Sequence, residues 1–241
     1  MKILAIGTRP GEVELGCGGC LINSHLENEQ IFVYVLSDSG WHKKGRRYSE
    51  SLGAAWRLMA PTSLWVDNFS EDDLLTSSRV LDNLKFFIRL VEPDVVLCPS
   101  PNDSSLQRRK VASRVIEASD SQYNVLAYEQ PDTGGFRPQA YYDISDVLAN
   151  KLDLCNAFSA EEGSRTSAAG ALARRRAVEF GMESFAAEAF EIISYHISKN
   201  FGVENIVSKF PAPPAEKSAP QNNCIIEYAS IISPLRGNAG A

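Results

Sequence analysis

The sequence predicts an α/β fold, a Rossmann-like, doubly wound and mostly parallel sheet with helices on both faces. Short apolar segments of strand length lack polar alternation, which is typical of strands buried on both sides. These segments alternate with longer ones of helical periodicity, the order that produces parallel strands joined by crossover helices. With 241 residues, of which 44% are hydrophobic, the chain has enough material for one such domain and a sizeable core.

In the first third of the chain, each predicted strand is followed by a loop and a helix. Residues 2–7 are apolar after Lys2 and predict a fully buried strand. A helix is expected from about Glu14 to Glu27, after a loop that holds Pro10. The second strand, the next helix and a short third strand are predicted at residues 31–36, 48–59 and 64–67.

The clearest helix is predicted over residues 73–92. The acidic run at residues 71–73 favours a helix N-terminus, because carboxylates stabilise the positive end of the helix dipole. The apolar residues recur at spacings of 3, 4 and 7, which places on one face Leu74, Leu81, Leu84, Ile88 and Val91.

In the second half of the chain, residues 94–98 predict a buried strand, and Ser104 is a suitable N-cap for a helix over residues 104–118. Further elements are expected as strands at 123–129 and 140–144 and as helices at 145–156 and 168–199. Together, residues 1–209 are expected to form one domain. Residues 210–241 are rich in Pro, Ala, Ser and Asn and are expected to form a loosely packed or disordered tail.

Composition and charge limit the classes of function. The formal net charge of −6 argues against a general nucleic-acid binder, which needs a basic surface to neutralise phosphates. No apolar run approaches the ~18 residues of a membrane span, and the apolar start is too short for a signal peptide, so a cytoplasmic protein is expected. Among the five cysteines only Cys17 and Cys20 are closely spaced, and small buried thiols are favoured over a redox or zinc pair.

Functional residues are expected in three loops, at residues 8–14, 37–47 and 99–109, each of which follows a predicted buried strand. Ligands of open α/β sheets bind beyond the carboxyl ends of the strands, near the point where the strand order reverses. These loops should therefore meet at one edge of the sheet.

Two of these loops carry recognisable motifs. Residues 6–19 read Ile-Gly-Thr-Arg-Pro-Gly-Glu-Val-Glu-Leu-Gly-Cys-Gly-Gly, and residues 101–108 read Pro-Asn-Asp-Ser-Ser-Leu-Gln-Arg. They resemble Gly-Ala-His-Pro-Asp-Asp-x-Glu-Leu-Gly-Cys-Gly-Gly and Pro-x-Asp-x-His-x-Asp-His, the signatures of the LmbE-like (PIG-L-type) N-acetylglucosamine deacetylases. Weaker similarities to this family follow in order at Asp38-Ser39-Gly40, Arg47 with Glu50, Glu92-Pro93-Asp94-Val95-Val96, Tyr142-Asp143-Ile144-Ser145 and Ala187-Glu188-Ala189-Phe190.

The resemblance implies hydrolysis of an acetamide by a zinc-bound water. In the family, zinc is held by the His and second Asp of the first motif and by the last His of the second, and the first Asp is the general base. This sequence has Arg9, Glu12 and Arg108 at the ligand positions and Gly11 at the position of the base. Arginine has no lone pair for a metal and glycine has no side chain to accept a proton. We therefore expect neither zinc nor a replacement cofactor.

The three histidines offer no replacement ligand set. His25 lies in the second half of the first predicted helix and is interpreted as a surface residue. His196 lies near the end of the last predicted helix, where a cation is mildly stabilising. His42 lies in the loop after the second strand, so a contact with a ligand and a plain loop position both remain open.

Two hypotheses describe the altered pocket. In the first, Arg9 and Arg108 face each other across the former metal position with Glu12 between them, and the alternative is that these side chains turn outward to solvent. In the second, the surplus positive charge binds a phosphate or carboxylate, because arginine forks suit such groups; Arg109 and Lys110 contribute unless they are only a solvated helix face. The other candidate ligand contacts are Asp38, His42, Arg47 and Asp103.

Three functional classes remain. The favoured class is a deacetylase homologue without zinc-dependent activity, which binds a sugar-like or anionic ligand or a protein partner in glycan or secondary-metabolite metabolism. The first alternative is an enzyme with metal-independent chemistry in the same pocket, with Glu12, Asp38 and Asp103 as acid–base candidates. The second alternative is an atypical zinc-dependent N-acetyl-sugar deacetylase.

Overall fold

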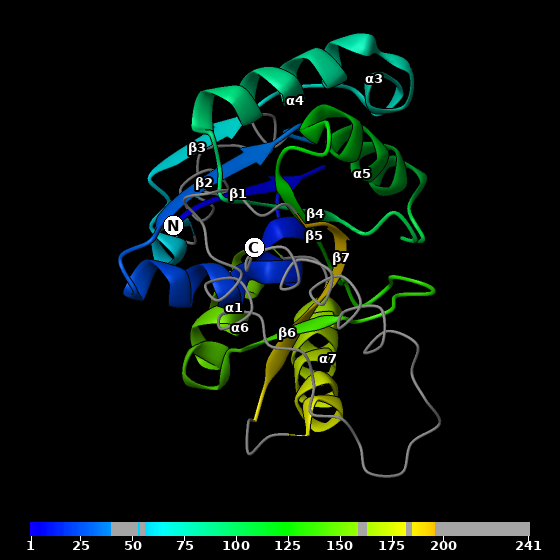
Figure 1. Ribbon diagram of the computed structural model, residues 1–241. Helices are drawn as coiled ribbons and strands as arrows, with labels where there is room; N and C mark the ends of the chain where they lie inside the picture. The colour runs from blue at the N-terminus through cyan, green and yellow to red at the C-terminus, as the bar shows by residue number, and fades with distance from the viewer. Residues whose placement is uncertain (40–52, 54–55, 159–162, 182–184, 196–241) are drawn as a thin grey trace, which may run out of the picture.

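The computed structural model describes residues 1–39, 53, 56–158, 163–181 and 185–195 (Figure 1). Within these residues the sheet has seven strands in the order β3-β2-β1-β4-β5-β7-β6. The strands are β1 (Lys2–Gly7), β2 (Gln30–Val35), β3 (Ser63–Val66), β4 (Val95–Pro99), β5 (Asn124–Tyr128), β6 (Ala140–Asp143) and β7 (Ala187–Ser194). The described helices are α1 (Glu12–Leu26), α3 (Glu71–Thr76), α4 (Ser78–Val91), α5 (Leu106–Ser119), the 3₁₀ turn η2 (Ser145–Val147), α6 (Leu148–Phe158) and α7 (Gly163–Phe180).

The sheet is mostly parallel and doubly wound, as the sequence predicts. Strands β3, β2, β1, β4 and β5 pair in parallel, whereas β7 is antiparallel to both β5 and β6. The chain runs outward from β1 to β3 and then returns to place β4 on the other side of β1. The strand order therefore reverses between β1 and β4, the position at which such sheets bind ligands.

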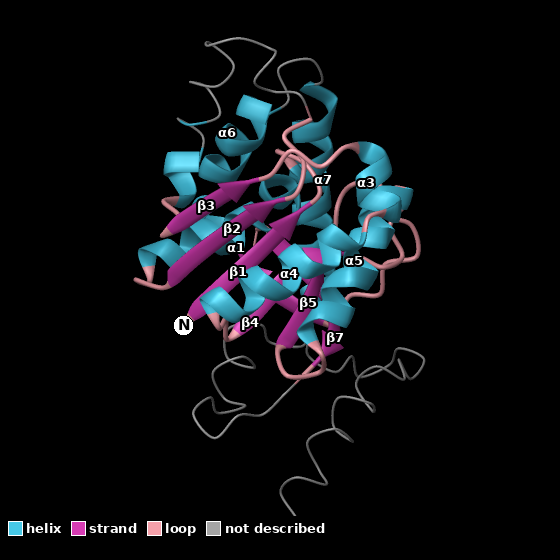
Figure 2. Ribbon diagram, turned by 90° about the horizontal axis from the view of Figure 1, so that it is seen from above, coloured by secondary structure: helices cyan, strands magenta, loops and turns pink. Residues whose placement is uncertain are grey.

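Helices cover both faces of the sheet (Figures 1 and 2). Strand β1 shows why, because its alternate side chains enter different cores: Ile3 packs with the residues of α1, and Leu4 packs with those of α4 and α5. Both side chains are fully buried, so a strand between two helical layers has no polar face to show in its sequence. Helices α1, α6 and α7 form one layer, and α3, α4 and α5 form the other.

The helix predicted over residues 168–199 is wrong in its second half. Helix α7 ends at Phe180, and residues 187–194 form β7 instead. The segment Ala-Glu-Ala-Phe-Glu carries residues with good helix propensity, which explains the error. Tertiary pairing overrides that propensity, because the segment lies between β5 and β6 and its first five residues are buried.

The helix predicted over residues 73–92 is two helices. The break falls at Ser77, whose extended backbone (φ −75°, ψ 129°) ends α3 and precedes α4. Arg114 of α5 compensates the carbonyls at this break, since its guanidinium donates to the oxygen of Ser77 at 2.7 Å and to that of Leu75 at 3.1 Å. Two smaller differences are that Ser105, and not Ser104, caps α5, and that the helix predicted at 145–156 begins with the 3₁₀ turn.

Helix α1 is bent at Cys17 (φ −138°), and a buried carboxylate stabilises the bend. Glu188 of β7 accepts from the amides of Gly19 and Cys20 at 2.8 and 2.7 Å and pairs with Lys151 at 2.5 Å. The glycines of the first motif permit this close packing, because a Cβ at Gly16 would lie 2.2 Å from the Tyr128 ring. The first turn of α1, which carries Glu12, is thus fixed against the sheet.

Several predictions lie outside the described residues. They are the tail at 210–241, the loop at 40–47 with His42 and Arg47, and most of the helix at 48–59, of which residues 53 and 56–59 are helical. None of the helices in the described part combines the length and the apolar character that a membrane span requires.

Candidate functional site

The two motifs meet at the carboxyl edge of the sheet, where β1, β4 and β5 end. Arg108 of α5 lies at the centre of this meeting, and its side chain is only 5% exposed. Around it lie Glu12 of α1, Asp103 from the loop after β4, and Gln130 and Asp132 from the loop after β5. We call Glu12, Asp103, Arg108, Gln130 and Asp132 the Arg108 cluster.

The Arg108 guanidinium uses all three of its nitrogens within this cluster. Its Nε donates to Asp103 at 2.6 Å, its Nη1 to Gln130 at 2.5 Å, and its Nη2 to Asp132 at 2.5 Å. Burial lowers the pKa of Arg108, but the hydrogen bond that Arg108 donates to Asp132 and the charges of Asp103 and Glu12 outweigh it and raise the pKa. Arg108 is therefore a fixed, permanently positive group that already has its partners.

Glu12 is buried and is held mainly by backbone. Its Oε2 accepts from the amides of Thr8 at 2.7 Å and Arg9 at 3.2 Å, and its Oε1 lies 4.0 Å from Nη1 of Arg108. Burial raises the pKa of Glu12 above its ordinary value. The charge of Arg108 and the hydrogen bonds from these amides lower it by less. Both oxygens thus face donors of this chain.

Arg9 does not join the cluster, which corrects the predicted three-membered Arg9–Glu12–Arg108 arrangement. Its guanidinium turns outward and donates to Glu71 of α3 at 2.7 Å. The two side chains are 36% and 67% exposed. Only the Arg9 backbone amide contacts Glu12, so Arg108 and Glu12 form the part of the prediction that the structure brings together.

The position of the general base is a backbone turn. Gly11 has φ 95°, a conformation that favours glycine, and a Cβ there would lie 3.1 Å from Phe158. Its amide donates to Glu14 at 2.8 Å, and Trp56 donates to the other oxygen of Glu14 at 2.5 Å. Burial raises the pKa of Glu14 to about 7. Glu14 is thus a buried acid that the sequence reasoning did not single out.

Of the other candidates, Asp103 is in the cluster and Asp38 is not. Both oxygens of Asp103 have partners, since Oδ1 also accepts from the Ser105 amide at 2.8 Å and Oδ2 accepts from Thr133 at 3.0 Å. Asp38 follows β2 and is partly buried.

Gln130 and Asp132 were missed because the sequence reasoning did not include the loop after the strand at 123–129. Gln130 matters for the site because it links the two motifs: its Oε1 accepts from Arg108 and its Nε2 donates to the carbonyl of Glu12 at 3.2 Å. The signal that was available is the sequence Gln130-Pro131-Asp132 directly beyond a buried strand, the same position that identified the other loops.

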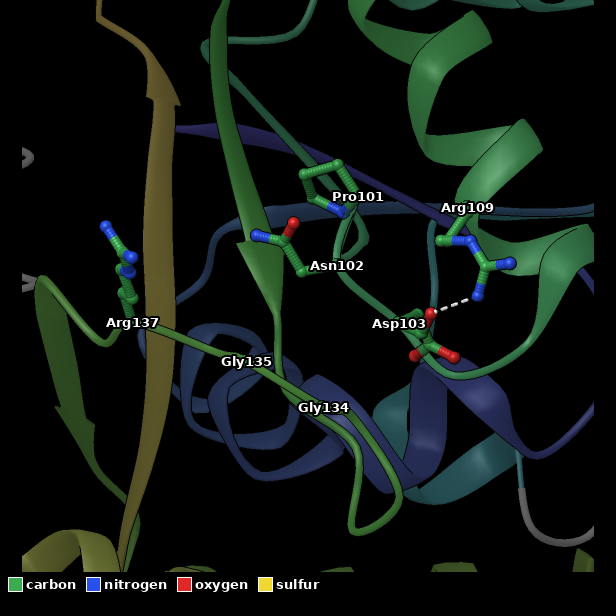
Figure 3. Close-up of a pocket in the computed structure, with 7 residues that line it drawn as sticks. All are labelled: Pro101, Asn102, Asp103, Arg109, Gly134, Gly135 and Arg137. Carbon is green, nitrogen blue, oxygen red and sulfur yellow. Dashed lines mark hydrogen bonds between the residues drawn. The ribbon is translucent and has the colours of Figure 1, made fainter.

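A cavity of about 680 Å³ adjoins the cluster at Asp103 (Figure 3). Its walls come from the loop after β4, the start of α5 and the loop before β6. The lining residues are Pro101, Asn102, Asp103, Arg109, Gly134, Gly135 and Arg137.

The residues at the family's metal positions do not fit a zinc ion. A zinc site needs about three protein ligands with free lone pairs, and two of the three positions are guanidinium groups. The remaining carboxylate, Glu12, accepts from two amides and faces Arg108. Across the described ranges, no group of three or more His, Cys, Asp or Glu side chains is arranged to hold a metal ion.

Solved structures share this fold. The chain superimposes on the conserved protein TT1542 from Thermus thermophilus with a TM-score of 0.72 and 18% identity, covering 83% of this chain and 98% of that one. It matches the 4-carboxy-2-hydroxymuconate hydratase GalB from Pseudomonas putida KT2440 with a TM-score of 0.70 and 17% identity, over 83% and 99% of the two chains. It matches the N,N'-diacetylchitobiose deacetylase from Pyrococcus horikoshii with a TM-score of 0.70 and 18% identity, over 82% and 86%.

These matches confirm the predicted resemblance to deacetylases at the level of the fold. No protein-family model matches the chain, and no curated protein matches it in sequence. The fold is also that of a hydratase, so it does not by itself specify a reaction.

Proposed function

We propose that this chain is an LmbE-like (PIG-L-type) deacetylase homologue that works without zinc. In this proposal it binds a sugar-like or anionic small molecule, or a protein partner, in glycan or secondary-metabolite metabolism. Support comes from three sources: the two sequence motifs, the fold shared with a diacetylchitobiose deacetylase, and the chemistry of the altered pocket.

The observation that carries the proposal is the buried Arg108 guanidinium at the position of the last zinc ligand. A positive group held by three short hydrogen bonds repels a divalent cation, and it offers no lone pair to it. A zinc-bound water would also need a base, and Gly11 has none to offer. Restoring one ligand would therefore not restore the deacetylation chemistry.

Metal content and acetate release test this proposal together. The purified full chain is expected to hold zinc far below one ion per chain and to release no acetate from N,N'-diacetylchitobiose or N-acetylglucosamine. A matched control restores the family residues with Arg9→His, Gly11→Asp, Glu12→Asp and Arg108→His, and we expect it to bind more zinc than the natural chain. Stoichiometric zinc in the natural chain, with acetate release that a chelator abolishes, would contradict the proposal and favour an atypical zinc-dependent deacetylase.

An enzyme with metal-independent chemistry is the second candidate, because one protein with this fold is a hydratase. The acid–base candidates are Glu12, Asp38 and Asp103. Glu12→Gln discriminates the two, since the amide keeps the size of the side chain and removes its charge. The Glu12→Gln variant is tested in the native pathway of the protein. Loss of the end product of that pathway, with an unchanged unfolding midpoint of the variant, would favour catalysis. An unchanged amount of product would favour a binding role.

A further inference from the structure

The cavity beside the Arg108 cluster has an arginine on two of its sides. Figure 3 shows Arg109 on α5 and Arg137 beside β7, with Pro101 and Asn102 between them. The volume of about 680 Å³ lies within the range of small-molecule sites, roughly 300–1,000 Å³. Arg137 and Asn102 are exposed and Arg109 is partly exposed, so a ligand has access from solvent.

The positive charge in this cavity is available, unlike that of Arg108. One nitrogen of Arg109 donates to the backbone oxygens of Asp103 at 2.6 Å and Ser104 at 2.8 Å, and its other nitrogens have no partner in the described residues. No carboxylate of the described residues lies within ion-pair distance of the Arg137 guanidinium; the buried Glu191 accepts from the backbone amide of Arg137 at 2.8 Å and from Ser100 at 2.9 Å. Two guanidinium groups are therefore uncompensated at one cavity.

The acid in the cavity wall does not cancel this charge. Asp103 pairs with Arg108 at 2.6 Å, and its second oxygen accepts from Thr133. Its negative charge is thus directed into the cluster and away from Arg109 and Arg137. The cluster as a whole sets one guanidinium against three carboxylates, those of Glu12, Asp103 and Asp132, so the guanidinium groups that line the cavity itself are those of Arg109 and Arg137.

Neutral donors complete the site. The backbone amides of Gly134 and Gly135 donate no hydrogen bond to any described residue, and a Cβ at either position would meet nothing within 4 Å. Gly135 has φ +66°, which favours glycine. An oxyanion can therefore approach these amides closely, in the manner of backbone anion sites. The side-chain amide of Asn102 offers a further donor from the opposite loop.

We propose that this cavity binds a small anionic ligand, a carboxylate or a phosphate, between Arg109 on one side and Arg137 on the other, with the Gly134–Gly135 amides in its wall. The inference deepens the ligand-binding function proposed above and rests on it, but it moves the anion from the former metal position to the neighbouring cavity. Arg108 cannot bind such a group without losing its present partners, whereas Arg109 and Arg137 can. Arginine forks match both carboxylates and phosphates, so the shared chemistry is a planar or tetrahedral oxyanion.

Titration calorimetry of the full chain with inorganic phosphate, and separately with malonate, tests the inference. The ionic strength is held constant, and chloride serves as the reference anion. We expect saturable binding of at least one of the two, and about tenfold weaker binding in Arg137→Gln, since a charge-assisted hydrogen bond is removed. The matched control is Arg89→Gln on the exposed face of α4, which makes the same charge change away from the cavity. Arg109→Gln is a second variant, used with a check of its unfolding midpoint because Arg109 also contacts backbone.

Tighter phosphate binding would support a phosphorylated ligand, and tighter malonate binding a carboxylated one. No saturable binding, or equal weakening in Arg137→Gln and Arg89→Gln, would overturn the inference. These outcomes are independent of zinc content and acetate release. A protein that binds anions here and also holds catalytic zinc would disprove the proposed function and leave this inference standing.

Discussion

The segments that follow β1 and β4 carry the same replacement with opposite results: each has an arginine where the resembling family has a zinc-binding histidine. In the first turn of α5, just beyond the loop after β4, Arg108 is buried and has three hydrogen-bonded side-chain partners. In the loop after β1, Arg9 turns outward, and its guanidinium pairs with the exposed Glu71. The type of residue is identical, so its surroundings decide where the charge lies.

The difference indicates that the burial of an arginine in this site depends on the presence of buried acids that can pair with it. Burial of an unpaired guanidinium is very costly, and Arg108 avoids this cost because Asp103, Asp132 and Glu12 surround it. Arg9 would have to share Glu12, whose oxygen already accepts from two backbone amides. With Arg9 turned outward, Arg108 is the guanidinium that faces the other oxygen of Glu12.

The largest effect is expected from Arg108→Met. The substitution leaves Asp103 and Glu12 buried without their cation, which costs about 3–5 kcal/mol when one partner of a buried pair is removed. Urea unfolding followed by circular dichroism measures the loss. The double variant Arg108→Met with Asp103→Asn serves as control, because it removes both charges and should recover part of the stability. A single variant as stable as the natural chain would show that the cluster contributes nothing.

The sequence predicted most of the fold, because the signals of this fold are local. Unbroken apolar strands and the motif order placed the parallel strands β1 to β5 and the helices between them. Strand β7 was missed because its residues favour a helix by themselves and become a strand only by pairing with β5 and β6. The break at Ser77 was missed as well, and its carbonyl accepts from Arg114 of another helix, a contact that the local sequence does not reveal.

The site was predictable as far as the motifs reach. The motifs predicted that Glu12 and Arg108 would lie together, and they do, at 4.0 Å. They could not predict the direction of Arg9, since its partner Glu71 is 62 positions away and belongs to neither motif. Gln130 could have been predicted, because it follows a buried strand and such positions carry ligand sites. The burial of Glu14 against Trp56 could not, because it depends on packing that no motif describes.

An intermediate effect is expected from Glu14, which lies under the loop after β1. Its pKa of about 7 in the folded chain exceeds the ordinary value of 4.5, so the folded state holds the proton more tightly than the unfolded state. This contribution to stability is complete below pH 4.5 and is lost as pH rises through 7, by about 2 kcal/mol between pH 5.5 and 8. Unfolding measured across that range in the natural chain and in Glu14→Gln isolates the slope, which should flatten in the variant. An equal slope in both proteins would assign the pH dependence to other groups.

The smallest effect is expected from Arg9→Ala. Exposed ion pairs contribute about 0–1 kcal/mol, because water screens them and two long side chains lose freedom to form them. Glu71→Ala should match it, and the double variant should cost no more than their sum, all measured by urea unfolding at low and high salt. A loss as large as that of Arg108→Met would mean that Arg9 stabilises the former metal position after all, and the contrast between the two loops would fail. A small loss of stability that disappears at high salt would show that the Arg9–Glu71 pair lies at the surface. Arg108, which has buried acids around it, would then be the buried cation of this site.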